Sequence, residues 1–192
     1  TLKAIYGVDL NPFSIAISRF RLLVAALKAA DIRHLKDAPN FHFNLAVGDS
    51  LLHGFATQQL LTGGTELDEK IGHVYRAEDA EELWRIFTQQ YHAVVGNPPF
   101  ITVKDKALNQ AYRERYGSCH RKYSLAVPFM ERFFTLALKS EDGCPAGFVG
   151  KITANSFMKR EFGKKLIEQH LPRWNLTHVL DTSGAYIPGH GT

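Results

Sequence analysis

The sequence has few of the features that mark extracellular, metal-binding or membrane proteins. Its two cysteines, Cys119 and Cys144, lack the spacing of metal ligands, and nine histidines are scattered along the chain. A chain of 192 residues also needs no disulfide bonds to fold. No apolar run approaches the ~20 residues that span a bilayer, and residues 1–6 do not resemble a signal peptide. We therefore expect a reduced, cytoplasmic protein with no metal site and no membrane contact.

The composition is that of an ordinary globular domain. Hydrophobic residues make up 45% of the chain and charged residues 22%, and no internal repeat or low-complexity segment divides it. We expect residues 1–192 to form one unit without a separate second domain. The first residues already have the pattern of a strand, and residues 188–192 have that of a loop. We therefore also expect the chain to be a piece of a longer protein.

Short apolar runs alternate with amphipathic segments along the chain. The expected strands cover residues 4–9, 41–47, 91–95, 147–153 and 177–181, and the expected helices cover residues 12–27, 78–90, 124–140 and 159–170. Strands that alternate with helices are typical of a mostly parallel sheet covered on both faces. The pattern therefore predicts an α/β fold.

The first expected helix has a clear beginning. Asn11 can cap it, and Pro12 stands at the first helical position, where its missing N–H costs nothing. Apolar residues then recur at helical spacing, and we expect them to bury one face of the helix: Phe13, Ala16, Ile17, Phe20, Leu23, Val24 and Leu27.

The tetrapeptide Asn97-Pro98-Pro99-Phe100 follows the strand expected over residues 91–95. Its prolines lack a backbone N–H, so they end the strand, and they hold φ fixed in a stiff turn. The turn keeps the Asn97 amide and nearby carbonyl groups in one orientation beside an aromatic ring. This arrangement suits a planar base with an exocyclic amino group. The alternative is a strand ended by proline, with Phe100 in the core.

Three polar residues stand at the carboxyl ends of successive expected strands: Asp9, Asp49 and Asn97. In an open α/β sheet these ends share one crevice, where ligands bind. An acid at the end of an early strand commonly accepts hydrogen bonds from ribose hydroxyl groups, which is the role we expect for Asp9. Asp49 is suited to the amino group of a cofactor's adenine. Each acid alone could instead be a helix cap.

These residues resemble motifs of a known family. Val8–Pro12, Gly48–Leu51 and Asn97–Phe100 are similar, in this order, to the second, third and fourth motifs of the adenine-specific DNA methyltransferases with the gamma motif order. Residues 152–157 resemble a later strand and turn of that family, so the resemblance covers most of the chain. More narrowly, residues 9–27 and 181–192 resemble the PglX-type methyltransferases of phage-growth-limitation and BREX defence systems.

The resemblance implies a Rossmann-like class I fold and methyl transfer from S-adenosylmethionine to the exocyclic amine of adenine in double-stranded DNA, in a restriction-modification or phage-defence system with possible partner proteins. The Asn97 side-chain oxygen and the Pro98 carbonyl would accept the two N–H bonds of the amine. Phe100 would stack on the flipped base. By the same resemblance, the catalytic residues are Asn97, Pro98, Pro99 and Phe100, and the cofactor contacts come from Asp9, Asn11, Pro12, Asp49, Ser50 and Leu51.

Basic residues follow the proline turn. The net charge of +4 is a mild excess, so the placement of the charges matters more than their sum. Four of them are candidates for contacts with DNA phosphates: Lys104, Lys106, Arg121 and Lys122. The alternative is a solvated face.

The sequence departs from the family pattern at the first motif, a glycine-rich turn that holds the methionine end of the cofactor. Nothing before Asp9 can supply it, so we expect it to precede Thr1 in the intact protein. Its strand is central in the family's sheet, and we therefore expect a gap or an exposed edge there. We also expect little activity from residues 1–192 alone, and a target recognition region after Thr192.

Other functions remain open from the sequence. Asn-Pro-Pro-aromatic motifs also occur in methyltransferases that act on protein glutamine or on guanine in ribosomal RNA. A methyltransferase fold that only binds nucleic acid is a second alternative. A dinucleotide-binding oxidoreductase is a third, although the chain has no Gly-x-Gly-x-x-Gly motif. The long segment 51–90 and the basic residues after Phe100 favour a DNA enzyme.

Overall fold

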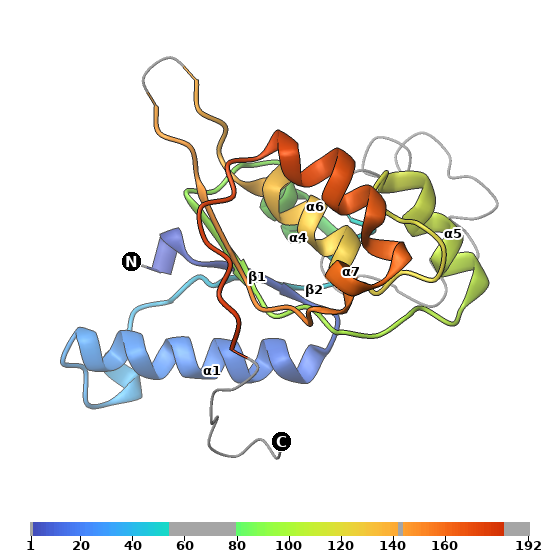
Figure 1. The fold of residues 1–192 in the computed structure, drawn as a ribbon. Helices are drawn as coiled ribbons and strands as arrows, with labels where there is room; N and C mark the ends of the chain where they lie inside the picture. The colour runs from blue at the N-terminus through green and yellow to red at the C-terminus, as the bar shows by residue number, and fades with distance from the viewer. Residues whose placement is uncertain (1, 54–79, 142–143, 183–192) are drawn as a thin grey trace.

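The computed structural model describes residues 2–53, 80–141 and 144–182 (Figure 1). Two pairs of short strands form its centre: β1 (Tyr6–Asp9) with β2 (Asn44–Val47), and β3 (Ala93–Gly96) with β4 (Phe148–Lys151). Both pairs are parallel, which confirms the α/β pattern expected from the sequence.

The sheet is interrupted between these pairs. Tyr6 lies opposite Asn44 in the first pair, and Gly96 lies opposite Lys151 in the second. Among the described strands, no ladder joins one pair to the other. The sequence analysis expected a gap or an exposed edge in the sheet, and the two separate ladders agree with that expectation.

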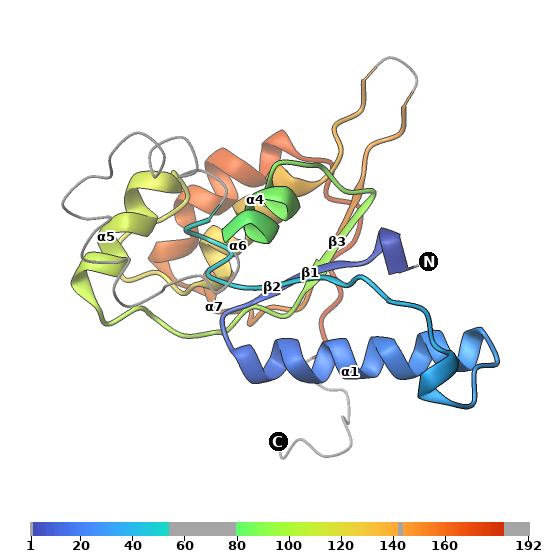
Figure 2. The same ribbon diagram turned by 180° about the vertical axis from the view of Figure 1, so that it is seen from behind.

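Helices cover these strands on two sides (Figures 1 and 2). The α-helices are α1 (Pro12–Ala29), α4 (Ala80–Phe87), α5 (Lys106–Arg115), α6 (Ala126–Leu136) and α7 (Ser156–Lys159). Shorter helical turns are η1 (Leu2–Ala4), η2 (Leu35–Asp37), η3 (Glu161–Gly163), η4 (Leu166–His170) and η5 (Leu171–Arg173). Helices α1 and α4 pack on opposite sides of the β1–β2 pair, and α6 packs on the β3–β4 pair. None of the described helices has the length and apolar content needed to cross a membrane.

Helix α1 begins as predicted but buries a different face. The Asn11 side chain accepts a hydrogen bond from the Phe13 N–H at 2.9 Å. Phe13 and Phe20 are 76% and 66% exposed, whereas Ile15 is buried. The prediction of a buried Phe13–Leu27 face was therefore wrong over the first half of the helix. The helix has apolar residues on more than one side, and the side with Ile15 packs on the strands.

Two other predicted elements differ from the structure, and one helix was not predicted. The helix expected over 159–170 is divided into α7, η3 and η4, and at Gly163 the chain runs so close to the Phe157 backbone that an added Cβ would clash with its carbonyl oxygen. The strand expected over 177–181 has no regular secondary structure and joins no ladder among the described residues. Helix α5 was not predicted at all. Residues 78–79 of the helix expected over 78–90, and residues 183–192, lie outside the described ranges.

The core has two parts. The larger cluster joins α5, α6 and the turn after β2, and it includes Leu51, Tyr112, Tyr116 and Val127. The smaller one lies between β2 and α4, around Ala46, Leu83, Ile86 and Phe87. The larger cluster fixes the position of the turn that carries Asp49.

Candidate functional site

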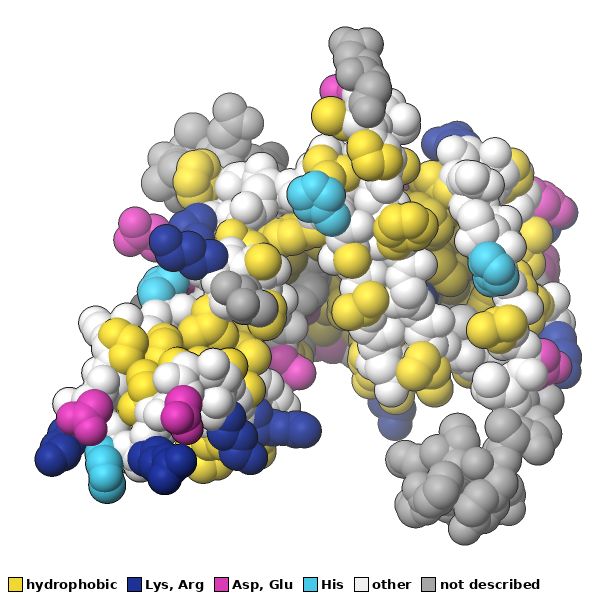
Figure 3. All heavy atoms as spheres, turned by 90° about the vertical axis from the view of Figure 1, so that its left-hand side faces the viewer, with side chains coloured by type: hydrophobic (Ala, Val, Ile, Leu, Met, Phe, Trp, Pro, Cys, Tyr) yellow, Lys and Arg dark blue, Asp and Glu magenta, His cyan; other side chains and the backbone are white. Residues whose placement is uncertain are grey.

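A cavity of about 660 Å³ is lined by both β1 and β3. Its walls include every residue over 4–10 and 93–99, together with side chains from α4 and α6. Like β2 and β4, each of these strands pairs on one side only among the described residues. On the face drawn in Figure 3, hydrophobic side chains lie at the surface on both sides of a central hollow. The cavity therefore follows the interruption in the sheet and extends to its carboxyl ends.

The three strand ends predicted to share one crevice do line this cavity. Asp9, Asp49 and Asn97 all take part in its walls. Of the other residues proposed from the sequence, Ser50, Pro98 and Pro99 also line the cavity, whereas Asn11, Pro12, Leu51 and Phe100 do not.

Asp49 is held by three hydrogen-bond donors. The side chain is only 6% exposed. One carboxylate oxygen, Oδ1, accepts the backbone N–H groups of Leu51 at 2.7 Å and Leu52 at 3.2 Å. The other, Oδ2, accepts the Tyr112 hydroxyl at 2.5 Å. These donors occupy three of the roughly four acceptor positions of a carboxylate, so the donors from the described residues leave one position for a ligand.

Side chains from distant segments hold the rest of the turn over residues 49–53. The Tyr116 hydroxyl donates to the Leu51 carbonyl at 2.8 Å. Arg132 donates through Nε to the Ser50 carbonyl at 3.2 Å and through Nη2 to the His53 carbonyl at 2.9 Å. Burial lowers the pKa of Arg132 and raises the pKa of Tyr116. The turn is thus fixed by α5, its C-cap residue and α6.

The proline turn after β3 is held differently. A Cβ at Gly96 would lie 2.6 Å from the Phe133 ring, so a larger residue there would require this ring of α6 to move. Pro98 is buried and Asn97 is exposed. Within the described ranges, no hydrogen bond engages the Asn97 side chain. Beyond the turn, the Ile101 carbonyl accepts the Leu125 N–H at 2.9 Å, which ties the chain to the start of α6.

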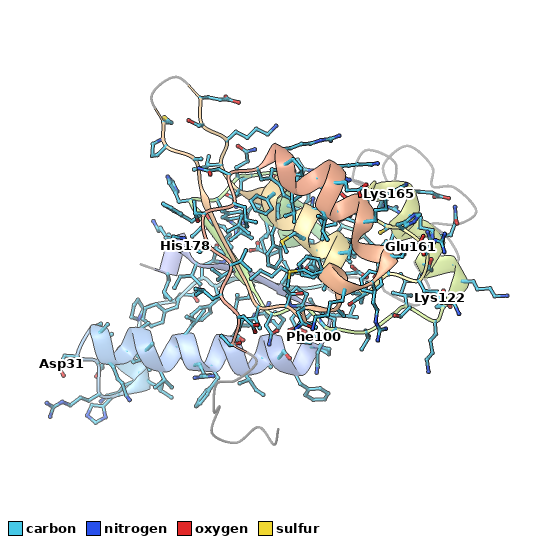
Figure 4. The ribbon with its side chains drawn as sticks, viewed as in Figure 1. Asp31, Phe100, Lys122, Glu161, Lys165 and His178 are labelled. Carbon is cyan, nitrogen blue, oxygen red and sulfur yellow. The ribbon has the colours of Figure 1, made fainter. Side chains whose placement is uncertain are left out.

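Phe100 and Asp9 are both accessible. Phe100, labelled in Figure 4 on the chain between β3 and α5, is 48% exposed. The prediction of an accessible ring agrees with this exposure better than the alternative of a core phenylalanine does. Asp9 is exposed, and its Oδ1 accepts the Asn11 N–H at 2.7 Å. Asn11 and Pro12 form the start of α1, and Leu51 is buried in the larger core cluster.

The four basic residues proposed to contact DNA are exposed, and none lines the cavity. Arg121 forms an ion pair with Glu161 at 2.8 Å, and Figure 4 labels Lys122 and Glu161 beside α5. Lys104 and Lys106 lie between the proline turn and the first turn of α5. Their role in DNA binding stays a prediction.

The sequence analysis missed three side chains that the structure places around the site: Tyr112, Arg132 and Lys151. Leu108, Ala111 and Tyr112 have helical spacing, which is the signal that could have revealed α5 and its buried face. Lys151, the partner of Gly96 in the ladder, donates a hydrogen bond to the Ala126 carbonyl at the start of α6. Burial lowers its pKa to about 7.

No cluster of three or more potential metal ligands occurs among the residues that the structure describes. The polar side chains that line the cavity are two carboxylates, a carboxamide, a serine, three tyrosines and one buried guanidinium group. Such groups accept and donate hydrogen bonds to a polar ligand and hold it in one orientation.

Comparisons with known proteins agree with the motifs. The model of the Eco57I restriction-modification methylases matches residues 3–186. The adenine-specific methyltransferase PglX of Streptomyces coelicolor is 52% identical over the whole of this chain, which covers 16% of that protein. No solved structure matches the chain.

Two more distant relatives match about half of the chain. Type II methyltransferase M.BstVI of Geobacillus stearothermophilus is 30% identical over 52% of the chain, and this part covers 18% of that protein. Type II methyltransferase M.PaeR7I of Pseudomonas aeruginosa is 32% identical over 48% of the chain, which covers 15% of that protein. The chain thus spans less than a fifth of the length of these relatives.

Proposed function

Because the chain belongs to the family of Eco57I restriction-modification methylases, we propose that it forms part of the catalytic domain of an adenine-specific DNA methyltransferase. The domain has the Rossmann-like class I fold, and the parallel strand pairs with helices on both sides support this. The reaction is transfer of a methyl group to the exocyclic amine of adenine in double-stranded DNA. One observation carries the proposal: Asp9, Asp49 and Asn97 line the same cavity.

The cavity fits S-adenosylmethionine in size and in chemistry. Its volume of about 660 Å³ lies within the usual range for small-molecule sites. The exposed Asp9 carboxylate can accept hydrogen bonds from ribose hydroxyl groups, and the remaining acceptor position of Asp49 can take an amino group. Ser50 adds a third polar group at the same wall. When bound, S-adenosylmethionine supplies an activated methyl group.

The proline turn prepares the target base. The Asn97 side-chain oxygen and the Pro98 carbonyl accept the two N–H bonds of the adenine amine, which directs the nitrogen lone pair away from the ring plane. Holding the nitrogen in this orientation provides much of the rate, because the reacting atoms meet in the correct geometry. Phe100 stacks on the flipped base and contributes roughly 1–3 kcal/mol, which offsets part of the cost of flipping.

The remaining parts of the proposal concern partners. Three exposed lysines follow the proline turn and can contact DNA phosphates: Lys104, Lys106 and Lys122. Arg121 can do the same if it gives up its ion pair with Glu161. The resemblance to PglX-type methyltransferases supports a role in restriction-modification or phage defence together with partner proteins.

The test uses the full-length protein with duplex DNA and tritium-labelled S-adenosylmethionine. The DNA is digested and the labelled nucleoside is identified for the wild type, for Asn97→Ala and for the control Asn175→Ala, an exposed asparagine away from the cavity. We expect methyladenine from the wild type and the control, and at least about 100-fold slower formation of it by Asn97→Ala. Label in RNA guanine or protein glutamine, or no transfer at all, would contradict the proposal.

A further inference from the structure

Helix α5 brings a buried tyrosine to the cavity. Asp105 caps the helix, since its side chain accepts the Leu108 N–H at 2.7 Å. Leu108, Ala111 and Tyr112 form the buried face, and Tyr112 is only 3% exposed. Tyr112 is the residue of α5 that lines the cavity. The helix therefore holds this side chain beside the turn over residues 49–53.

The Tyr112 hydroxyl contacts Asp49, the side chain that we propose to bind the adenine amine of the cofactor. It donates to Asp49 Oδ2 at 2.5 Å, although the two residues are 63 positions apart in the sequence. Hydrogen bonds to an ionised carboxylate at this length are among the stronger ones in proteins. The backbone N–H groups of Leu51 and Leu52 hold Oδ1 of Asp49. The bond from Tyr112 to Oδ2 therefore fixes the rotation of the carboxylate about the Cβ–Cγ bond.

We propose that Tyr112 is a positioning residue of the cofactor site, which holds the Asp49 carboxylate in the orientation that accepts the adenine amine of S-adenosylmethionine. This inference rests on the proposed function. A tyrosine from α5, a helix that follows the proline turn in the sequence, thus completes the half of the site that binds the cofactor. Without its hydroxyl, the Oδ2 atom can turn toward water or toward other donors, and the site has to be ordered again when the cofactor binds.

Tyr116 provides a matched comparison. Its hydroxyl also reaches the turn over residues 49–53 and donates to the Leu51 carbonyl at 2.8 Å. Both tyrosines are buried in the same core cluster, and they are one helical turn apart. The bond from Tyr116, however, goes to a backbone carbonyl group, and Tyr116 does not line the cavity. Tyr112→Phe removes a buried bond to the Asp49 carboxylate, whereas Tyr116→Phe removes a buried bond to the Leu51 carbonyl of the same turn.

The experiment measures the binding of S-adenosylmethionine to the full-length protein by titration calorimetry, for the wild type, Tyr112→Phe and Tyr116→Phe. We expect Tyr112→Phe to raise the Kd about tenfold, the effect of one oriented hydrogen bond to a charged group. Tyr116→Phe, which removes a bond to a backbone carbonyl of the turn, should raise the Kd clearly less than Tyr112→Phe does. Both variants should lower the thermal midpoint by similar amounts, because each loses one buried bond.

A double-mutant cycle tests whether Tyr112 acts through Asp49. Tyr112→Phe in an Asp49→Asn background should change the Kd by less than about twofold, since the carboxylate it positions is gone. The inference is overturned if Tyr112→Phe leaves the Kd unchanged, if both tyrosine variants weaken binding equally, or if the two substitutions are additive. A wild-type protein that binds no S-adenosylmethionine would overturn the proposed function as well, whereas normal wild-type binding and methylation with any of those results would overturn this inference alone.

Discussion

The turns after β2 and β3 line the same cavity but are held in opposite ways. Both begin with a glycine at which a helix closes on the strand end, since a Cβ would lie 2.6 Å from Leu83 at Gly48 and 2.6 Å from Phe133 at Gly96. After Gly48, Asp49 is buried, and three distant side chains bond the turn. After Gly96, Asn97 is exposed, and two prolines stiffen the turn. One turn is ordered by tertiary contacts and the other by its own covalent structure.

This difference suits the proposed roles of the two turns, in which the turn after β2 binds the cofactor and the turn after β3 binds the target base. A cofactor site gains affinity when its polar groups are fixed before binding, which long-range contacts provide. A site for a flipped base must be reached from outside, and an exposed but stiff turn meets that need. Substitutions in the two turns should therefore affect different steps of the reaction.

The largest effect is expected for Asn97→Ala. This substitution removes the proposed acceptor for the adenine amine, and we expect the methyl-transfer rate to fall about 10²–10³-fold, as for loss of an oriented polar group that acts on the reacting centre. Single-turnover kinetics on duplex DNA with the full-length protein would measure this loss. An unchanged rate would show that Asn97 does not take part in methyl transfer, and would contradict the proposed role of the turn after β3.

Arg132→Met tests the tertiary contacts of the other turn. It leaves the carbonyl groups of Ser50 and His53 without this donor, so we expect a loss of about 3 kcal/mol in stability and weaker cofactor binding. Hydrogen exchange over residues 49–53 and calorimetry would show both effects. The control is Arg160→Met, an exposed arginine outside the cavity. Equal exchange in both variants would mean that α6 does not hold this turn.

Lys151→Met should show a pH-dependent gain in stability. Burial lowers the pKa of Lys151 from 10.5 to about 7 in the folded protein. Between these values the unfolded chain binds the proton and the folded protein does not, so the destabilisation by Lys151 is complete below pH 7 and disappears toward pH 10.5. We expect Lys151→Met to stabilise the protein by about 2 kcal/mol at pH 6.5 and hardly at all at pH 10.

Scanning calorimetry at the two pH values measures this difference, with exposed Lys159→Met as the control. A loss of stability in Lys151→Met at pH 6.5 would show that the bond to the Ala126 carbonyl outweighs the cost of burying the amine. The end of β4 would then be held to the start of α6 by this bond.

The smallest effect is expected for Phe100→Leu. The side chain is half exposed, so folding should change little, while loss of base stacking should weaken DNA binding about fivefold. Phe100→Tyr keeps the ring and should bind DNA as the wild type does. Fluorescence anisotropy with an oligonucleotide would measure both, and equal affinity in the leucine variant would place Phe100 outside the base pocket.

Local features of this protein could be predicted from the sequence, and contacts between distant segments could not. The cap at Asn11 and the turn at Asn97–Phe100 depend on neighbouring residues, and the order of strand ends placed Asp9, Asp49 and Asn97 on one cavity. The periodicity of α1 could not show which of its apolar sides faces the strands. Tyr112 and Arg132 bond residues 63 or more positions away, and no local pattern encodes such a contact.

The central claim is that the turn after β2 binds the cofactor and the turn after β3 does not. The most direct test is a titration of full-length Asp49→Asn and Asn97→Ala variants with S-adenosylmethionine. We predict that Asp49→Asn weakens cofactor binding at least about tenfold, because it removes the charge that Tyr112 and the turn hold in place. Asn97→Ala should bind within about twofold of the wild type. The reverse result, or equal loss in both variants, would contradict the account.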